Sequence, residues 1–303
     1  MATDEIVQQL LASKAPGLAT WGLAFLNAKK AEGLARSTLK GAYAPVLLAF
    51  FAFCTRRGVG EVEAIDPELI RGHLLAVGEG HAPSTIHRHY RVIKTWLRWY
   101  EVEAAPDGWR NPIRRLRAPK VPEQILDPVS LEDLAELVRV ANTRDRAILL
   151  AMVDTGLRAG ELLALDVEDF DNAEGVFVVR HGKGGRARVA PLGQTARRAV
   201  RRWIRERQPA GRALFTTTRG NRMNYWALRT MLGRLADRAD VPRPKLHGIR
   251  RAFGIGMLRA GVDLLTVSRM LGHSTVSQTP KYLKQVVADL RAAVERASLA
   301  DRL

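Results

Sequence analysis

Between residues 154 and 165 the chain reads DTGLRAGELLAL. A helical apolar pattern runs from Ala147 to Val153 and stops at Gly156, a residue type that readily takes the left-handed conformation at a helix end. Two charged residues, Arg158 and Glu161, follow where apolar side chains would otherwise continue. The stretch therefore predicts a turn between two helices with charged side chains gathered beside it.

Three further segments concentrate polar residues in the same way. They are His181-Gly182-Lys183-Gly184-Gly185, then Leu246-His247-Gly248-Ile249-Arg250-Arg251, and last Leu271-Gly272-His273-Ser274 with Tyr282 beyond it. His247 and Arg250 are three residues apart, so they share one face of a helix. Taken singly, each segment also fits an ordinary turn, cap or solvated loop. Taken together and in this order, they indicate one site.

The pattern around Lys183 is that of a β-hairpin. Residues 175–180 are rich in β-branched side chains, residues 181–185 form a glycine-rich turn, and residues 186–189 alternate polar and apolar. Helical patterns cover most of the remaining chain. We therefore expect a mainly α protein with a small β-hairpin or sheet, in the α+β class.

The N-terminal half has only helical patterns. One helix is expected from Ser37 to Thr55, where Cys54 looks like a small core residue, and another from Ser84 to Tyr100. The second has an apolar face made of Ile86, Tyr90, Ile93, Trp96, Leu97 and Tyr100. Its other positions carry a basic stripe, which fits either a phosphate-contacting surface or a solvated face.

A proline-rich, basic stretch separates the two halves. Five of the 14 prolines lie between positions 106 and 128, and proline disfavours regular structure in its vicinity. We predict an N-terminal domain over residues 1–105, a basic linker over 106–129 and a C-terminal domain over 130–303. The latter opens with Ser130 as a helix cap before Glu132 and Asp133.

The charge of the chain points to a polyanionic partner. Lys and Arg number 48 against 31 Asp and Glu, for a net charge of +17, and both halves are cationic. Two basic domains suggest a clamp around a duplex. A single cysteine excludes a disulfide framework, and no apolar run approaches the ~18 residues of a membrane span. We expect a soluble protein of a reducing compartment.

The four polar segments together resemble the tyrosine recombinases, or phage integrase family. That family's catalytic order is Arg, Asp or Glu, Lys on a hairpin, His-x-x-Arg, His or Trp in an LGH-type motif, and Tyr. The matching residues here are Arg158, Glu161, Lys183, His247, Arg250, His273 and Tyr282. One departure is Arg251, where many members have histidine; we expect it to change local packing or DNA contact and not activity.

The resemblance covers about residues 15 to 300 and implies a fold and an assembly. The first domain resembles the family's SAM-like core-binding helices, and the second its catalytic domain, the two closing as a C-shaped clamp on DNA. Without an additional N-terminal arm-binding domain, the chain is most similar to simple Xer-like or Cre-like recombinases. The resemblance further implies a homotetramer or heterotetramer on double-stranded DNA with paired half-sites, a C-terminal helix at about residues 286–299 docking on a neighbour, and a Holliday-junction intermediate.

The residue types suit attack by a tyrosyl oxygen on a phosphodiester. Two guanidiniums, Arg158 and Arg250, can stabilise charge on the non-bridging oxygens. His247 and His273 can donate hydrogen bonds or carry the tyrosyl proton, and Lys183 can protonate the departing 5′ oxygen. Glu161 is expected to orient Arg158 or His247.

No cofactor is expected. Neither a carboxylate cluster with metal-ligand spacing nor a phosphate-binding GxxxxGK[ST] motif is evident, so we predict a reaction free of metal and of ATP. We expect a cytoplasmic, nucleoid-associated protein with no membrane partner. The expected DNA contacts are Lys40, His87, Arg88, Arg91, Lys94, Arg98, Arg114, Arg115, Arg117 and Arg186.

Two other functions fit parts of the pattern. A type IB topoisomerase nicks and religates DNA with a related Arg, Lys, Arg, His and Tyr set, but the SAM-like domain and the LGH motif favour a recombinase. A catalytically silent architectural DNA-binding protein would keep the fold. The presence of Tyr282 and both arginines argues against it.

Overall fold

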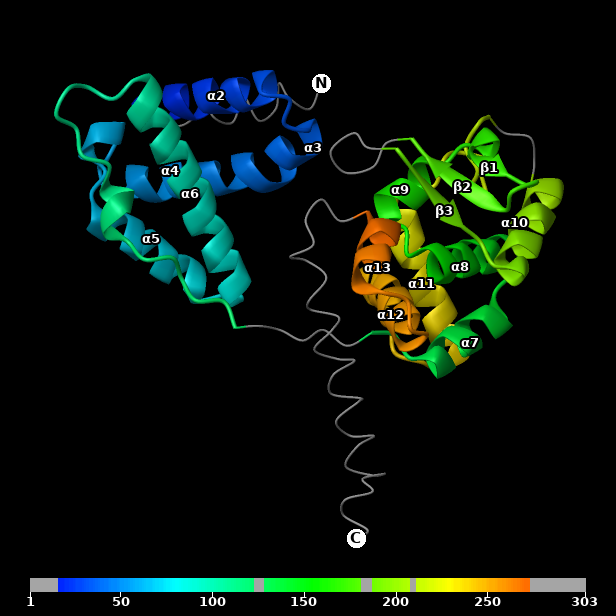
Figure 1. The fold of residues 1–303 in the computed structure, drawn as a ribbon. Coiled ribbons are helices and arrows are strands. Elements are labelled where there is room, and N and C mark those ends of the chain that lie inside the picture. The colour runs from blue at the N-terminus through cyan, green and yellow to red at the C-terminus, as the bar shows by residue number, and fades with distance from the viewer. Residues whose placement is uncertain (1–15, 123–127, 181–186, 208–210, 273–303) are drawn as a thin grey trace, which may run out of the picture. The chain divides into compact units, whose positions relative to one another are not determined.

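The computed structural model describes residues 16–122, 128–180, 187–207 and 211–272. Contacts divide the chain into two units, Met1–Gln124 and Ile125–Leu303. The described part of the first unit is helical, and the second combines helices with one small sheet (Figure 1). The expected mainly α class with a small β element is confirmed. None of the described helices is both long and apolar enough to cross a bilayer.

Helix α6 is the centre of the first unit. Helices α2, α4 and α5 all pack against it, and its predicted apolar face is confirmed, with Trp96 and Tyr100 among the largest fully buried side chains. The elements of this unit are α2 (Pro16–Ala31), α3 (Arg36–Thr38), η1 (Leu39–Tyr43), α4 (Ala44–Arg56), η2 (Val62–Ala64), α5 (Pro67–Gly78), α6 (Pro83–Glu103) and η3 (Pro112–Arg115).

The helix expected from Ser37 to Thr55 is interrupted by a wider turn. It consists of α3, the π-helical η1 and α4 in succession, and the Ala44 N–H bonds to the Leu39 carbonyl five residues back. Pro45 explains the widening, because proline has no N–H and its ring crowds the carbonyl four residues earlier. Cys54 lies in the core as expected, and burial raises the pKa of its thiol to about 12.

Residues 111–119 belong to the first unit and pack within it. The Asn111 side chain donates to the Leu97 carbonyl at 3.0 Å, and the Tyr90 hydroxyl donates to the Leu116 carbonyl at 3.1 Å. Part of the segment expected to be a linker therefore lies against α6. The domain boundaries at residues 105 and 130 stay a prediction.

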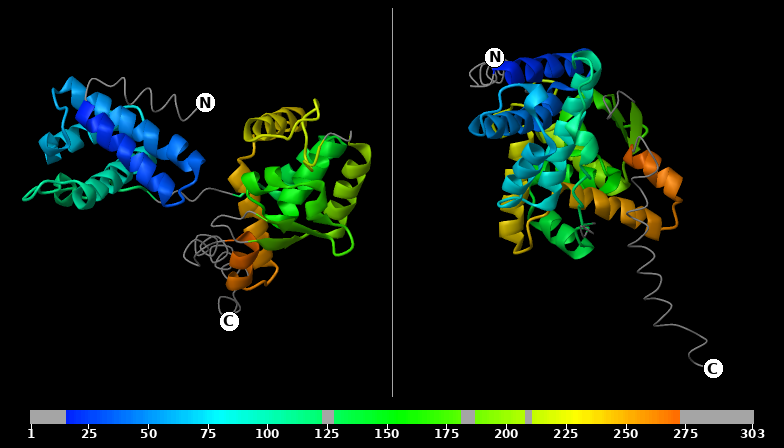
Figure 2. Two further views of the ribbon diagram at one scale, coloured as in Figure 1. Left: turned by 90° about the horizontal axis from the view of Figure 1, so that it is seen from above. Right: turned by 90° about the vertical axis from the view of Figure 1, so that its left-hand side faces the viewer.

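Helix α8 occupies the middle of the second unit. It packs on α10 and α12 and contacts β3 (Figures 1 and 2). The Ser130 hydroxyl accepts from the Asp133 N–H at 3.0 Å, which confirms the predicted cap of α7. The helices of this unit are α7 (Leu131–Val140), α8 (Thr143–Thr155), α9 (Ala159–Ala164), η4 (Val167–Asp169), α10 (Gln194–Glu206), α11 (Tyr225–Ala239), α12 (Leu246–Arg259) and α13 (Leu264–Leu271).

The sheet contains the predicted hairpin and one additional strand. Strands β1 (Phe170–Asp171), β2 (Val176–Val179) and β3 (Arg188–Pro191) are antiparallel in the order β1-β2-β3, and Val179 pairs with Arg188. The hairpin tip, residues 181–186, lies outside the described residues. Strand β1 has only two residues, too few for an alternating pattern to reveal it.

A buried histidine pair makes the first unit sensitive to acid. His73 Nε2 lies 3.0 Å from His89 Nδ1, and the ring of His73 contacts two phenylalanine rings. Burial, together with the charges of His89 and Arg56, lowers the pKa of His73 to about 4. Burial, with Arg88 and His81, lowers the pKa of His89 as well. Both rings are therefore neutral in the folded protein at neutral pH.

We expect this pair to stabilise the first unit fully above pH ~6.5 and to lose that effect as the pH falls through about 4, because the unfolded chain then binds protons that the folded pair excludes. The loss is on the order of 3 kcal/mol. Urea unfolding with hydrogen exchange in α5 and α6 measures it. His73→Leu should weaken the pH dependence, and replacing the exposed His81 by Gln, which removes only the last of the three causes that lower the pKa of His89, should change it far less. Equal pH dependence in wild type and His73→Leu would contradict this account.

Candidate active site

The turn between α8 and α9 positions Arg158 and Glu161. Helix α8 ends at Gly156 as the sequence predicted, with a φ of +57° at that residue, and Glu161 lies in the first turn of α9. Its carboxylate accepts the Arg158 backbone N–H at 2.9 Å and Arg158 Nη1 at 2.8 Å. Of the two residues that Glu161 was expected to orient, the structure pairs it with Arg158.

Arg250 reaches the same turn from α12. Its side chain is buried, with Nη1 donating to the Gly156 carbonyl at 2.6 Å and Nη2 to the Leu271 carbonyl. Arg158 Nη2 donates to the Gly272 carbonyl at 2.8 Å. Since residues 271 and 272 are consecutive, the two guanidiniums lie next to each other against the turn that ends α13. The structure thus brings together two residues 92 positions apart.

Both turns require glycine. Gly156 and Gly272 have φ of +57° and +61°, a region in which a side chain is strained. A Cβ on Gly156 would lie 2.4 Å from a ring atom of Phe253, and one on Gly272 would lie 2.7 Å from Arg188 Nε. The carbonyls that hold the arginines are therefore set by backbone conformations that other residues adopt only with strain.

His247 lies in the first turn of α12, three residues before Arg250. Although His247 is an exposed residue, partial burial lowers its pKa, and the positive charges of Arg251, Arg250 and Arg158 lower it further. The imidazole is therefore neutral near pH ~7, and a neutral ring nitrogen can accept a proton.

Arg188, at the start of β3, is a member of this cluster that sequence reasoning missed. Its Nη2 donates to Glu161 Oε2 at 2.7 Å. Burial alone would raise the pKa of Glu161, but the Arg158 N–H and the charges of Arg188 and Arg158 outweigh it, so the pKa is lowered. An arginine on an alternating strand looks like a solvated residue, so no local pattern distinguishes it.

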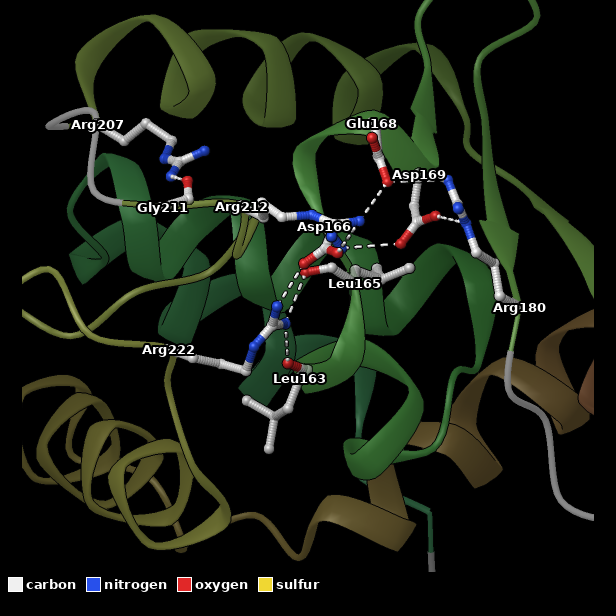
Figure 3. Close-up of polar contacts among 10 residues, drawn as sticks. All are labelled: Leu163, Leu165, Asp166, Glu168, Asp169, Arg180, Arg207, Gly211, Arg212 and Arg222. Carbon is white, nitrogen blue, oxygen red and sulfur yellow. Dashed lines mark hydrogen bonds and ion pairs between the residues drawn. The ribbon is translucent and has the colours of Figure 1, made fainter.

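A second polar network fixes the far end of α9 (Figure 3). Arg222 bonds to Asp166 and donates to the carbonyls of Leu163 and Leu165 at 2.9 and 3.1 Å. Arg212 pairs with Glu168 at 2.7 Å, and Arg180 with Asp169 at 2.5 Å.

These bonds tie the end of α9 to the segment around residues 211–222 and to the end of β2. They hold the helix whose other end carries Arg158.

Four predicted residues lie outside the described part of the chain: Lys183, Arg186, His273 and Tyr282. Their positions stay predictions. Among the described residues, no group of three or more His, Cys, Asp and Glu side chains is close enough together to hold a metal ion.

Comparison with known proteins identifies the family. The profile described as the phage integrase family matches residues 124–288. The chain belongs to this family. Two curated relatives are tyrosine recombinase XerC of Mycobacterium tuberculosis, 32% identical over 274 residues that cover 84% of this chain and 91% of that protein, and tyrosine recombinase XerA of Pyrococcus horikoshii, 31% identical over 204 residues that cover 65% and 70%. The predicted enzyme class, a tyrosine site-specific recombinase, is confirmed.

Solved structures share the fold. XerH site-specific recombinase, bound to a palindromic difH substrate, superposes with a TM-score of 0.72 at 19% identity, covering 98% of this chain and 95% of that one. A lambda integrase dimer bound to a COC′ core site gives a TM-score of 0.70 at 16% identity, covering 87% and 76%. These similarities show a tyrosine recombinase fold along most of the chain.

The expected DNA-contact residues of this recombinase differ in their surroundings. Two are tied to other parts of the first unit: His87 Nδ1 lies 2.9 Å from the Pro119 carbonyl, and Arg114 pairs with Glu101 at 2.9 Å. Lys94 is half-buried, with its ammonium over a tyrosine ring. The others in the described residues are exposed: Lys40, Arg88, Arg91, Arg98, Arg115 and Arg117.

A groove beside His247 was not predicted. It runs along α11, and its lining includes Tyr225, Trp226 and Arg229. Trp226 is 70% exposed and has the Arg229 guanidinium 5.4 Å from its ring centre. The available signal was the pair of adjacent aromatics after Asn224, because neighbouring helical positions point about 100° apart and cannot both face the core; in the structure both are exposed.

Replacing Gly156 by Ala tests the arginine anchor. We expect the second unit to lose about 2–4 kcal/mol of unfolding free energy, from left-handed backbone strain and the clash with Phe253. Guanidinium denaturation of the full chain measures it. The matched control is Gly160→Ala in α9, where a Cβ meets nothing within 4 Å; it should be neutral or stabilising by up to ~1 kcal/mol. Equal unfolding free energies of the two variants would contradict the claim that the turn at Gly156 requires glycine.

Proposed function

We propose that this recombinase cleaves and rejoins DNA strands through a covalent 3′-phosphotyrosine at Tyr282. The observation that carries the proposal is the pair of guanidiniums, Arg158 and Arg250, held on the consecutive carbonyls of residues 271 and 272. Two adjacent fixed cations match a phosphodiester, whose charge rises on two non-bridging oxygens as a fifth oxygen approaches phosphorus. We assign His273, the next residue in the chain, to the same phosphate on the family resemblance.

Proton movements follow from the neighbouring groups. The Tyr282 oxygen attacks phosphorus, and its proton passes to the neutral imidazole of His247 or to His273. The bond from phosphorus to the 5′ oxygen breaks, and the leaving oxygen takes a proton from Lys183. Rejoining is the reverse, with the 5′-hydroxyl of another strand as the nucleophile. The phosphotyrosyl ester keeps the bond energy, so the cycle needs no ATP, and we propose that it also uses no metal.

The substrate we infer is double-stranded DNA with paired half-sites. The XerH and lambda integrase structures both contain DNA. On two duplexes, a homotetramer or heterotetramer would cut one pair of strands, form a Holliday junction and resolve it with the second pair. The two units would close around the duplex as a clamp, acting on nucleoid DNA in the cytoplasm.

Two described surfaces support duplex binding. On α6, Arg88, Arg91 and Arg98 are exposed at helical spacing, opposite the buried aromatic face. On α11, Trp226 and Arg229 border the groove that reaches His247. Guanidiniums contact phosphates, and an exposed aromatic contacts sugars or bases. We assign both surfaces to DNA contact.

Tyr282→Phe tests the nucleophile. We expect it to abolish the covalent adduct and to leave DNA affinity nearly unchanged, because one hydroxyl contributes little among many phosphate contacts. The substrate is a duplex selected from randomised sequences by the full-length protein and nicked so that cleavage traps the adduct. Denaturing gels detect the adduct and gel shifts measure affinity. An adduct that persists in the variant would move the assignment to another tyrosine, with the exposed Tyr225 first to be replaced.

Neutralising the α6 stripe tests the clamp. The triple variant Arg88→Gln, Arg91→Gln and Arg98→Gln should weaken DNA binding and make the plot of log affinity against log salt shallower by about 0.9 for each phosphate that the stripe no longer neutralises. Arg71→Gln on α5, where Arg71 pairs with Glu68, is the matched control and should keep the wild-type slope. If the triple variant also keeps that slope, the stripe is only a solvated face.

A further inference from the structure

Glu161 is shared between two guanidiniums. Arg158 Nη1 donates to its Oε1 at 2.8 Å, and Arg188 Nη2 donates to its Oε2 at 2.7 Å. The side chains of Glu161 and Arg188 are only 5% and 13% exposed, so water screens these pairs little. One buried carboxylate therefore divides its interaction between a cation of the phosphate site and a cation from the hairpin.

Arg188 also lies directly against the turn that ends α13. A Cβ built on Gly272 would lie 2.7 Å from Arg188 Nε and 3.1 Å from its Cδ, and the Gly272 carbonyl accepts from Arg158. Arg188 thus joins β3, the start of α9 and the end of α13. Each of these contacts reaches Arg158 or a group bonded to it.

The burial of the Arg188 side chain is unfavourable for the stability of the fold. Its Nε and Nη1 are buried and have no hydrogen-bond partner among the described residues. Burial lowers its pKa and Arg158 adds to the lowering, while Glu161 opposes it. Buried, partly satisfied ion pairs contribute little stability relative to apolar side chains of similar size. The presence of a buried arginine at residue 188 is therefore better explained by its electrostatic effect on Glu161 and Arg158.

We propose that Arg188 is a positioning residue for strand cleavage, an inference that rests on the proposed function. Without it, Glu161 and Arg158 would form a closed pair with no net charge, and Arg158 would offer little positive potential to a phosphate. With Arg188 on the second oxygen, the three groups carry one net positive charge, and Glu161 orients Arg158 without neutralising it.

The experiment measures single-turnover cleavage by the full chain on the nicked, selected duplex. Arg188→Met should slow cleavage on the order of 10- to 100-fold, as removal of an outer-shell partner does elsewhere, with unchanged DNA affinity. Arg188→Lys, which keeps the charge, should recover part of the rate. Adding Glu161→Gln to Arg188→Met should make cleavage faster than in Arg188→Met alone, because the unshared carboxylate charge is then gone. A merely structural role would not produce that rescue.

Arg202→Met is the matched control. Arg202 lies on α10 and pairs with Glu206 of the same helix at 2.7 Å; its loss should leave cleavage at the wild-type rate. The inference is overturned if the double variant Arg188→Met with Glu161→Gln cleaves as slowly as Arg188→Met, or if Arg188→Met cleaves like the wild type. Either result leaves the proposed function standing. A wild-type chain that forms no adduct overturns the proposed function, and this inference with it.

Discussion

Two arginine side chains are held by main-chain carbonyls at the ends of two helices, and the arrangement of the site depends on this interaction. The carbonyl of Gly156 follows α8, and those of Leu271 and Gly272 end α13. Helix C-termini carry partial negative charge, so they favour cations placed there. Two guanidiniums side by side repel each other, and the helix ends offset that repulsion before any phosphate arrives.

Much of the fold follows from local patterns in the sequence. The apolar face of α6, the Ser130 cap and the stop at Gly156 were predictable because each depends on neighbouring residues in the chain. The π turn at η1 was not predicted, since the pattern of apolar residues continues across it although Pro45 does not fit an unbroken helix. The two-residue β1 has too little pattern to be read.

In the candidate site, too, some residues were predictable from the sequence and others were not. Arg158, Glu161, His247 and Arg250 were found from their order along the chain, and the structure links them through hydrogen bonds and charge. Arg188 escaped notice because its role depends on the approach of β3 to α9, a long-range contact that no spacing encodes. The groove on α11 was not predicted for a similar reason, since only the packed fold shows that both adjacent aromatics, Tyr225 and Trp226, are exposed.

Anchoring on the backbone separates the chemistry of this enzyme from its choice of DNA. Main-chain carbonyls and Glu161 hold the guanidiniums of Arg158 and Arg250. Under the DNA contact proposed for the exposed face of α11, side chains on that face can change with the DNA sequence while these backbone anchors stay the same. For an engineer who accepts that proposal, the α11 face is the part to randomise when redirecting the enzyme to a new site, and the two glycine turns are the part to leave untouched.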